Sequence, residues 1–300
     1  KQKTAYEILT CDWSSDVCSS DLERMHALYR ERYSDFTVKH FHEQLVRRHD
    51  YKLCYTVTRL SLQAAGLVPK AKRRGAHRKK RVRRPLPGML LFQDGSTHRW
   101  LAALERDCDL VVTLDDATGA IYSAILVEQE GTQSSFLGLM ETIAEHGLFS
   151  AFYTDRGSHY FVTPKAGEKV DKTRLTQVGR ALRQLGIRHM PSYSPEARGR
   201  MERVFGTLQN RLPPELRRAG VTTKEAANRY LRETFVPAYN ARFGKPAAED
   251  GSAFVAYAGA ELRDVLCVQE DRQVGRDNCV SWARKSLQIP AQRHRQHYVK

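Results

Sequence analysis

The stretch from Phe149 to Asn210 decides the expected fold of this chain. It contains FSAFYTDRGSHYF (149–161) and RHMPSYSPEARGRMERVFGTLQN (188–210). The apolar run that opens the first segment predicts a strand ending at Asp155. The second segment predicts another strand, a Ser-Pro break and then a basic helix that contains one central acid, Glu202. An acid at a strand end beside an acid on a helix can form an oxygen cage for Mg²⁺.

A third oxygen donor is expected on an earlier strand, and MLLFQDGSTHRWL (89–101) supplies Asp94. The order Asp94, Asp155, Glu202, with YTDRGSHY and YSPEARGRMERVF around the last two, resembles the DDE core of insertion-sequence transposases, most nearly the ISNCY group. These proteins belong to the retroviral-integrase-like superfamily, and the resemblance covers residues 23–300. It implies an RNase H-like fold in which the three acids are catalytic residues and metal ligands.

The hydrophobic pattern of the central region independently indicates an α/β core. Three strands come first, then helices and strands alternate, which describes a mixed five-stranded sheet with helices on both faces. The expected strands are 89–92, 109–114, 121–127, 149–155 and 188–193, and the expected helices are 135–146, 172–185, the Glu202 helix and 224–243. Leu212-Pro213-Pro214 is expected to interrupt the Glu202 helix.

Other acids and histidines compete for roles in the site. Asp115 and Asp116 follow a strand, but a DDATG sequence is explained by turn and cap chemistry. Glu196 follows Pro195 at a helix start, where an acid suits the helix dipole, so Glu202 is preferred. His98 and His159 lie near the acids in sequence and receive no general-base role.

Two features depart from the usual pattern of the superfamily. Asp155 and Glu202 are separated by 46 residues, more than is common, and the excess lies in a polar stretch over 161–176 that predicts an inserted loop. Many relatives carry a basic residue seven positions after the glutamate for donor DNA. Gln209 occupies that position here, so Arg203 or Arg211 is the expected replacement.

Residues 1–22 are set apart from the fold. KQKTAYEI and DWSSDVCSSDL resemble translated sequencing-library adapter, so Glu23 is expected to be an internal residue of the natural protein. Removing this segment takes away two lysines and four acids, and the formal net charge rises from +15 to +17. Such an excess of positive charge indicates a polyanionic partner, most simply nucleic acid.

Residues 23–69 predict helices arranged as a helix-turn-helix. Val38, Phe41 and Leu45 recur on one helical face after Asp35, a candidate N-cap, and Val57, Leu60 and Ala64 repeat the spacing before Gly66. The second helix would enter a DNA major groove, with an ordinary helical hairpin as the alternative. The residues expected to face DNA are Lys52, Tyr55, Thr56, Thr58, Arg59 and Gln63.

A basic linker is expected over residues 70–88. KAKRRGAHRKKRVRR (70–84) holds ten lysines and arginines and no acid. Such a block cannot pack into a core, and it would follow DNA phosphates without reading sequence. Its expected DNA-binding residues include Arg73, Arg74, Lys79, Lys80 and Arg81.

The C-terminal region, 244–300, predicts a linker and a small β-barrel with a further basic surface. Strand-like runs occur at 265–268, 279–282 and 286–289, separated by turn signals. The chain is expected to be truncated at Lys300. The intervening region 89–243 is the expected catalytic core.

The remaining composition limits the alternatives. Outside residues 1–22 the cysteines are Cys54, Cys108, Cys267 and Cys279, which form no CxxC pair and suit a reducing cytosol. His40, His42, His49 and Cys54 lack the second cysteine of a zinc site like that of integrases. No run approaches a membrane span.

These observations predict a DNA transposase that cuts transposon ends and joins them to target DNA by phosphodiester transesterification. The resemblance implies two Mg²⁺ ions, for which Mn²⁺ can substitute, double-stranded DNA as partner, a homo-oligomer on DNA, and a bacterial cytoplasmic, nucleoid-associated location. Two alternatives stay open. One is an RNase H-type nuclease that cuts without joining, and the other is a catalytically silent, transposase-derived DNA-binding protein.

Overall fold

The computed structural model describes residues 19–70, 81–163, 170–171, 173–193, 195–290, 292–295 and 298, and it describes no side chains for residues 195–198. Arg73, Arg74, Lys79 and Lys80 therefore lie outside the described residues, as does part of the expected inserted loop. Within the described residues, no helix is both long and apolar enough to cross a membrane.

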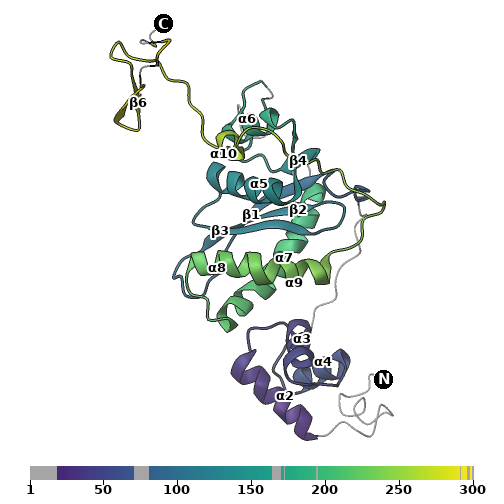
Figure 1. The fold of residues 1–300 in the computed structure, drawn as a ribbon. Coiled ribbons are helices and arrows are strands. Elements are labelled where there is room, and N and C mark those ends of the chain that lie inside the picture. The colour runs from purple at the N-terminus through teal and green to yellow at the C-terminus, as the bar shows by residue number, and fades with distance from the viewer. Residues whose placement is uncertain are drawn as a thin grey trace.

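A mixed five-stranded sheet forms the centre of the molecule (Figure 1). Its strands run in the order β3-β2-β1-β4-β5, with β1–β2 and β2–β3 antiparallel and β1–β4 and β4–β5 parallel. Their bounds are β1 Leu91–His98, β2 Cys108–Asp115, β3 Ile121–Val127, β4 Ala151–Thr154 and β5 Arg188–Pro191. The predicted mixed five-stranded sheet is confirmed, although Asp94 lies inside β1 rather than beyond its end.

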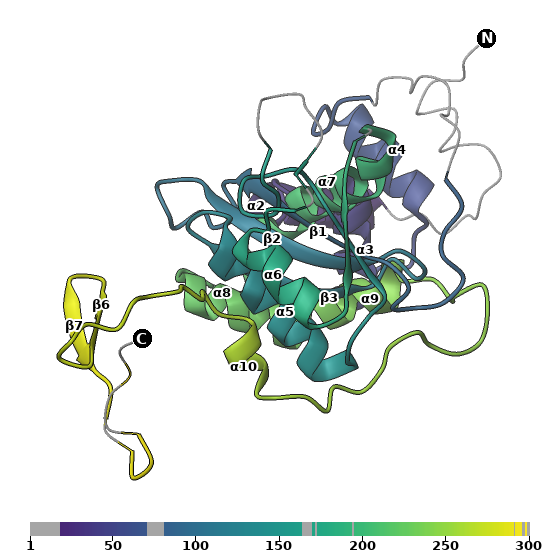
Figure 2. The ribbon, with the colours of Figure 1, turned by 90° about the horizontal axis from the view of Figure 1, so that it is seen from above.

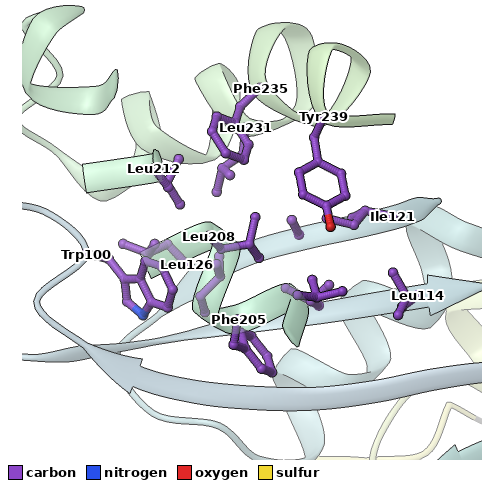
Figure 3. Close-up of a cluster of buried hydrophobic side chains, with 14 of the residues drawn as sticks. Trp100, Leu114, Ile121, Leu126, Phe205, Leu208, Leu212, Leu231, Phe235 and Tyr239 are labelled. Atoms are coloured by element: carbon purple, nitrogen blue, oxygen red, sulfur yellow. The ribbon is translucent and has the colours of Figure 1, made fainter. Parts of the chain in front are cut away.

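Helices cover both faces of this sheet, as predicted (Figure 1). On one face lie α5 Thr132–His146 and α6 Gln177–Gln184, with the short α10 Leu262–Val265 beside them. On the other lie α7 Pro195–Arg218, α8 Lys224–Tyr230, the π-helical turn η1 Leu231–Phe235 and α9 Val236–Phe243. Figure 3 shows the second face, where Leu208, Leu212 and Leu231 pack over β2 and β3.

The alternation of side chains along β1 and β4 assigns each residue to one face. Leu91 and Phe152 belong to the cluster under α5 and α6, whereas Phe92 belongs to the cluster under α7, and Tyr153 packs against that same cluster. Because successive side chains of a strand point to opposite faces, the residues two positions beyond Phe92 and Tyr153 point toward α7. These residues are Asp94 and Asp155.

The interruption expected at Pro213 and Pro214 is wrong, because α7 continues through both prolines to Arg218. A proline inside a helix removes a hydrogen bond and costs roughly 3 kcal/mol. Leu212 and Leu216 flank the prolines and are almost fully buried against the sheet. Burial of these two side chains offsets the lost backbone bonds.

Among the described residues, three helices precede the sheet, namely α2 Ser19–Arg32, α3 Val38–Arg48 and α4 Tyr55–Ala64. They share a small apolar cluster that includes Met25, Tyr29 and Leu62. Thr37, not Asp35, caps α3, with its hydroxyl accepting a hydrogen bond from the His40 backbone N–H. Neither this packing nor the helix positions confirms a helix-turn-helix, which stays a prediction.

The prediction that Val57, Leu60 and Ala64 form the buried face of α4 is wrong. Val57 and Leu60 are half-buried and Ala64 is exposed, while Thr58, Ser61 and Leu62 are buried. The two hydroxyls tolerate burial because each is hydrogen-bonded: Thr58 donates to the Cys54 carbonyl and the Ser61 hydroxyl pairs with His26 Nε2 at 2.8 Å. Thr58 therefore does not face DNA.

The C-terminal region contains one β-hairpin, β6 Cys279–Trp282 and β7 Lys285–Gln288, which lies apart from the main sheet (Figure 2). Residues 265–268, expected as a strand, instead comprise the last residue of α10, Val265, which is buried beneath α6, and the three residues that follow the helix. A barrel is not confirmed, because this two-stranded sheet is the only additional sheet among the described residues.

Candidate active site

Asp94 and Asp155 lie at the same level on adjacent parallel strands. The register pairs Leu91 with Phe152 and Phe92 with Tyr153. Asp94 lies two residues beyond Phe92 on β1, and Asp155 lies two residues beyond Tyr153, just past the end of β4. Both side chains are half-buried. The two acids thus follow paired positions of adjacent strands, although they are 61 positions apart in sequence.

Local backbone geometry fixes both carboxylates. Asp94 Oδ1 accepts a hydrogen bond from the Gly95 N–H at 3.2 Å, and Asp155 Oδ1 accepts one from the Gly157 N–H at 2.8 Å. Each acid is thus followed closely by a glycine whose N–H can approach it. A side chain at Gly157 would lie 2.9 Å from Asp155 Oδ1, which explains the glycine in TDRG.

Glu202 lies on the exposed flank of α7 rather than on the buried face of this helix. Met201 and Phe205, on either side of it along the helix, are buried against the sheet. Gln209, seven residues on and hence on the same flank, donates from Nε2 to Ser96 Oγ of β1 at 3.1 Å. The flank that carries Glu202 therefore borders the strand that carries Asp94.

The three predicted acids do not form a closed ligand cluster. Among the described residues, no group of three or more His, Cys, Asp or Glu side chains is arranged to hold a metal ion. The predicted ligand roles of Asp94, Asp155 and Glu202 stay predictions, although no cluster of all three is seen among the described residues. The reason is the position of Glu202, which is solvent-exposed on its helix, while Asp94 and Asp155 are fixed by the sheet.

The alternative acids have structural explanations, as the turn chemistry predicted. Asp115 and Asp116 are fully buried. Asp115 accepts from the N–H groups of Gly88 and Thr118 and from the Thr118 hydroxyl. Asp116 accepts from the Arg84 N–H and pairs with the guanidinium groups of Arg81 and Arg200. Glu196 lies in the first turn of α7, and its side chain is outside the described set.

Sequence reasoning missed a polar cluster on the opposite face of β1. Tyr160, fully buried, donates to Gln93 Oε1 at 2.9 Å and lies 3.4 Å from Glu130 Oε1. Burial, followed by the nearby charges of Glu130, Asp155 and Asp94, raises the pKa of Tyr160 well above its usual value. The tyrosine thus stays a neutral hydrogen-bond donor beneath the acid pair.

Glu130 explains the small residue after Asp94. A Cβ at Gly95 would lie 2.3 Å from Glu130 Oε2, so a larger residue there would require this carboxylate to move. His159 Nε2 lies 3.6 Å from Glu130 Oε1, which gives this histidine an acidic neighbour rather than a DNA-facing position. The Asp-Gly dipeptide was the only sequence signal for the cluster, since Glu130 itself lies in an ordinary loop before α5.

The predicted DNA-binding residues fall into three groups. Lys52, Tyr55, Thr56, Arg59 and Arg203 are exposed and stay candidates. Arg81 is partly exposed and paired with Asp116. Arg211 is 13% exposed and both its terminal nitrogens contact the Glu43 carboxylate at 2.8 Å, so it anchors α3 to α7 instead of facing open solvent.

Arg200 joins the linker to the helix that carries Glu202. Its guanidinium contacts Asp116 and donates to the Arg81 carbonyl at 2.8 Å. Burial, followed by the charges of Arg81, Arg83 and Arg203, lowers the pKa of Arg200 to about 10. Arg200 is still charged at neutral pH, and this basic cluster therefore depends on the single carboxylate of Asp116.

Two curated proteins are similar to this chain. A putative transposase, y4bF of Sinorhizobium fredii, is 34% identical over 275 residues, covering 91% of this chain and 60% of the relative. The transposase for insertion sequence IS1202 of Streptococcus pneumoniae is 34% identical over 164 residues, covering 55% and 35%. The chain thus spans less than two thirds of the length of either relative. No family model matches it.

Solved structures with a similar arrangement include two viral proteins. The HTLV-2 integrase catalytic core domain in complex with magnesium has 18% identity and a TM-score of 0.37, covering 50% of this chain and 89% of the other. The simian T-cell lymphotropic virus intasome in complex with PP2A regulatory subunit B56 gamma has 16% identity and a TM-score of 0.42, covering 77% of both. The sequence relatives carry the assignment: this chain is a homologue of proteins named transposases, and the resemblance predicted from its acidic motifs is confirmed.

Proposed function

We propose that this chain is part of a DNA transposase that cuts transposon ends and joins them to target DNA. The observation that supports the proposal is that Asp94 and Asp155 each follow, by two residues, the paired positions Phe92 and Tyr153 of adjacent strands, with the Glu202 flank of α7 beside β1. Homology to transposases supports the reaction class. The proposed units are residues 23–69 for DNA binding, 70–88 as linker, 89–243 as catalytic core and 244–300 as an accessory module.

The donor set fits Mg²⁺, for which Mn²⁺ is an accepted substitute. Asp94 and Asp155 offer half-buried carboxylate oxygens side by side, and hard divalent cations prefer such ligands. Glu202 would complete the set from the exposed flank of α7. When bound, two such ions lower the pKa of a water or 3′-OH and stabilise the leaving oxygen of a phosphodiester.

The contribution of the protein is positioning. Asp94 and Asp155 are held by the sheet register and by the N–H groups of Gly95 and Gly157, so their oxygens need little rearrangement to receive cations. Exposed Arg203, one residue after Glu202, is suited to hold a DNA phosphate near these acids. Members of this superfamily act as multimers on paired DNA ends, so we infer a homo-oligomer on DNA.

A strand-transfer assay tests the proposal directly. The full chain is incubated with supercoiled plasmid and a pool of oligonucleotides with recessed 3′-OH ends, with Mg²⁺ or Mn²⁺. Asp155→Asn and Glu202→Gln are compared with Asp250→Asn, a control at an exposed position after α9. We expect metal-dependent joining by the wild type and the control, and none by the two site variants.

Other outcomes separate the alternatives. Nicking without joining would favour an RNase H-type nuclease. DNA binding with no chemistry in either metal would indicate a silent DNA-binding protein. Joining that survives Glu202→Gln would remove Glu202 from the ligand set and leave Asp94 and Asp155 in it.

A further inference from the structure

A cleft of about 480 Å³ separates the N-terminal helices from the core. One wall is formed by α3, and the other by α7, η1 and α9, which lie beside the N-terminal helices in Figure 1. The cleft lining includes none of the three predicted acids, and nothing in the reaction described above uses it. Its lining differs from an ordinary interface because of its charge.

Arginines dominate this lining. Five guanidinium groups face two carboxylates, Glu43 and Glu215, which leaves an excess of three positive charges with the histidines neutral. The arginines are Arg47 and Arg48 of α3, Arg211 and Arg218 of α7, and Arg242 of α9. An interface built only to hold two units together would be expected to balance its charges, because like charges in a partly dry space repel.

Several of these side chains are already fixed in place. Glu43 pairs with both Arg211 and Arg242, and both guanidinium groups also lie over the Phe243 ring, with centroid distances of 5.0 and 5.4 Å. Arg48 Nε donates to Gln44 Oε1 at 2.9 Å. Guanidinium groups held this way lose little rotamer entropy when they bind a planar or tetrahedral anion.

Positive charge without an acidic partner gathers on the α3 wall. Arg47 and Arg48 are exposed, and within the described ranges neither has an ion-pair partner. Buried Arg218 Nε also has no hydrogen-bond partner among the described residues, although its Nη2 contacts Glu215 at 2.8 Å. A buried donor left unsatisfied costs free energy that an incoming anion would recover.

We propose that this cleft binds phosphate groups of duplex DNA, so that the N-terminal helices and the core grip the same duplex. The proposal rests on the DNA substrate of the proposed function, but not on its chemistry. Arg47 and Arg48 would make the contacts first, and Arg211 and Arg242 would share their charge between Glu43 and the backbone. The shape of the cleft, with walls from two units, favours an extended anion that continues beyond it.

Equilibrium DNA binding without divalent metal tests the cleft. The full chain and an Arg47→Ala/Arg48→Ala variant are titrated onto a short labelled duplex of arbitrary sequence, by fluorescence anisotropy, over a range of salt. The control is Arg229→Ala/Arg263→Ala, which removes two exposed arginines outside the cleft. Circular dichroism and thermal unfolding verify that all three proteins are folded.

The cleft variant should weaken binding by roughly tenfold or more at low salt, and the slope of log K against log salt should become shallower by about 0.9 for each lost phosphate contact. A loss of duplex affinity no larger than that of the control variant would overturn the proposal. If the variant loses binding of inorganic pyrophosphate in calorimetry but keeps its duplex affinity, the cleft takes a free phosphate ligand and the DNA assignment fails.

Glu43→Gln gives a test of opposite sign. It removes a negative charge that competes with DNA for Arg211 and Arg242, so duplex affinity should rise by several-fold. If affinity falls instead, Glu43 serves only to dock the helices and the cleft is not a DNA site. A failed strand-transfer assay together with a normal cleft result would reject the enzyme while keeping the DNA contact, so the two proposals fail separately.

Discussion

Two pairs of aspartates in one sheet show how differently a protein can use the same side chain. Asp115 and Asp116, at the end of β2, are fully buried, and their oxygens accept from several N–H, hydroxyl and guanidinium donors. Asp94 and Asp155, on β1 and beyond β4, are half-buried, and each accepts a hydrogen bond from the N–H of a glycine that follows it. The first pair stabilises the fold, while the second stays partly accessible to solvent, and we propose metal-dependent chemistry only for the second.

The largest expected contrast is in activity. Asp94→Asn should lower strand transfer by about a thousandfold or more, because a carboxylate ligand supplies several kcal/mol of transition-state stabilisation through its cation. Its free energy of unfolding should change by less than about 1 kcal/mol, since the site is half-exposed. Initial rates of joining and urea denaturation measure the two quantities. If Asp94→Asn is inactive only because it is unfolded, then Asp94 serves stability, as Asp115 and Asp116 do, and the contrast between the two aspartate pairs fails.

The reverse pattern is expected at Asp116. Asp116→Asn should lower the free energy of unfolding by about 3–5 kcal/mol, because it leaves buried Arg200 without its carboxylate partner. Urea denaturation with Asp250→Asn as the exposed control measures this loss. A change below about 1 kcal/mol would mean that the pair with Arg200 is structurally dispensable.

A smaller, pH-dependent effect is expected at Glu215, which is 15% exposed between α3 and α7. Burial alone would raise the pKa of this carboxyl, but hydrogen bonds from His40 and Arg218 outweigh burial and lower the pKa to about 2. A depressed folded-state pKa contributes stability that is fully present above about pH 4.5 and is lost as the pH falls toward 2.

Glu215→Gln should therefore be less stable than the wild type at pH 6, by on the order of 2 kcal/mol, and the difference should shrink at pH 3. Comparing the two proteins at each pH cancels the titration of all other carboxylates. A difference that does not depend on pH would show that Glu215 is paired no better in the folded chain than in the unfolded one.

Local sequence patterns predicted the sheet well because its strands depend on short-range alternation. Residues 121–127 form β3 with the predicted bounds, and α5 begins only three residues before the predicted start because the Ser134 hydroxyl accepts from the Gly131 N–H. The helix α6 is shorter than predicted, since its N-cap is Thr176. For β3, α5 and α6, the residues that gave the prediction lie within a few residues of the observed element.

The errors arise where distant residues decide the outcome. Arg211 stays a predicted DNA contact, but its pairing with Glu43, 168 positions away, was not predicted. The prolines of α7 looked like a break, but burial of Leu212 and Leu216 keeps the helix continuous. Glu130 lies beside Gly95 in the site region, but it comes from a loop that has no sequence motif to predict this position. The predicted roles of Asp94, Asp155 and Glu202 remain for the strand-transfer assay to test.

The strand order β3-β2-β1-β4-β5 also sets the order in which the molecule can assemble. β1 pairs with β2 through a short connection, whereas its parallel pairing with β4 closes a loop of about sixty residues, and β5 and α7 must follow. Long-range pairings of this kind form slowly, because the entropy of loop closure is lost before the contacts form. The two aspartates meet only on that late pairing, so a nascent chain should acquire its antiparallel hairpins well before it acquires the paired acids.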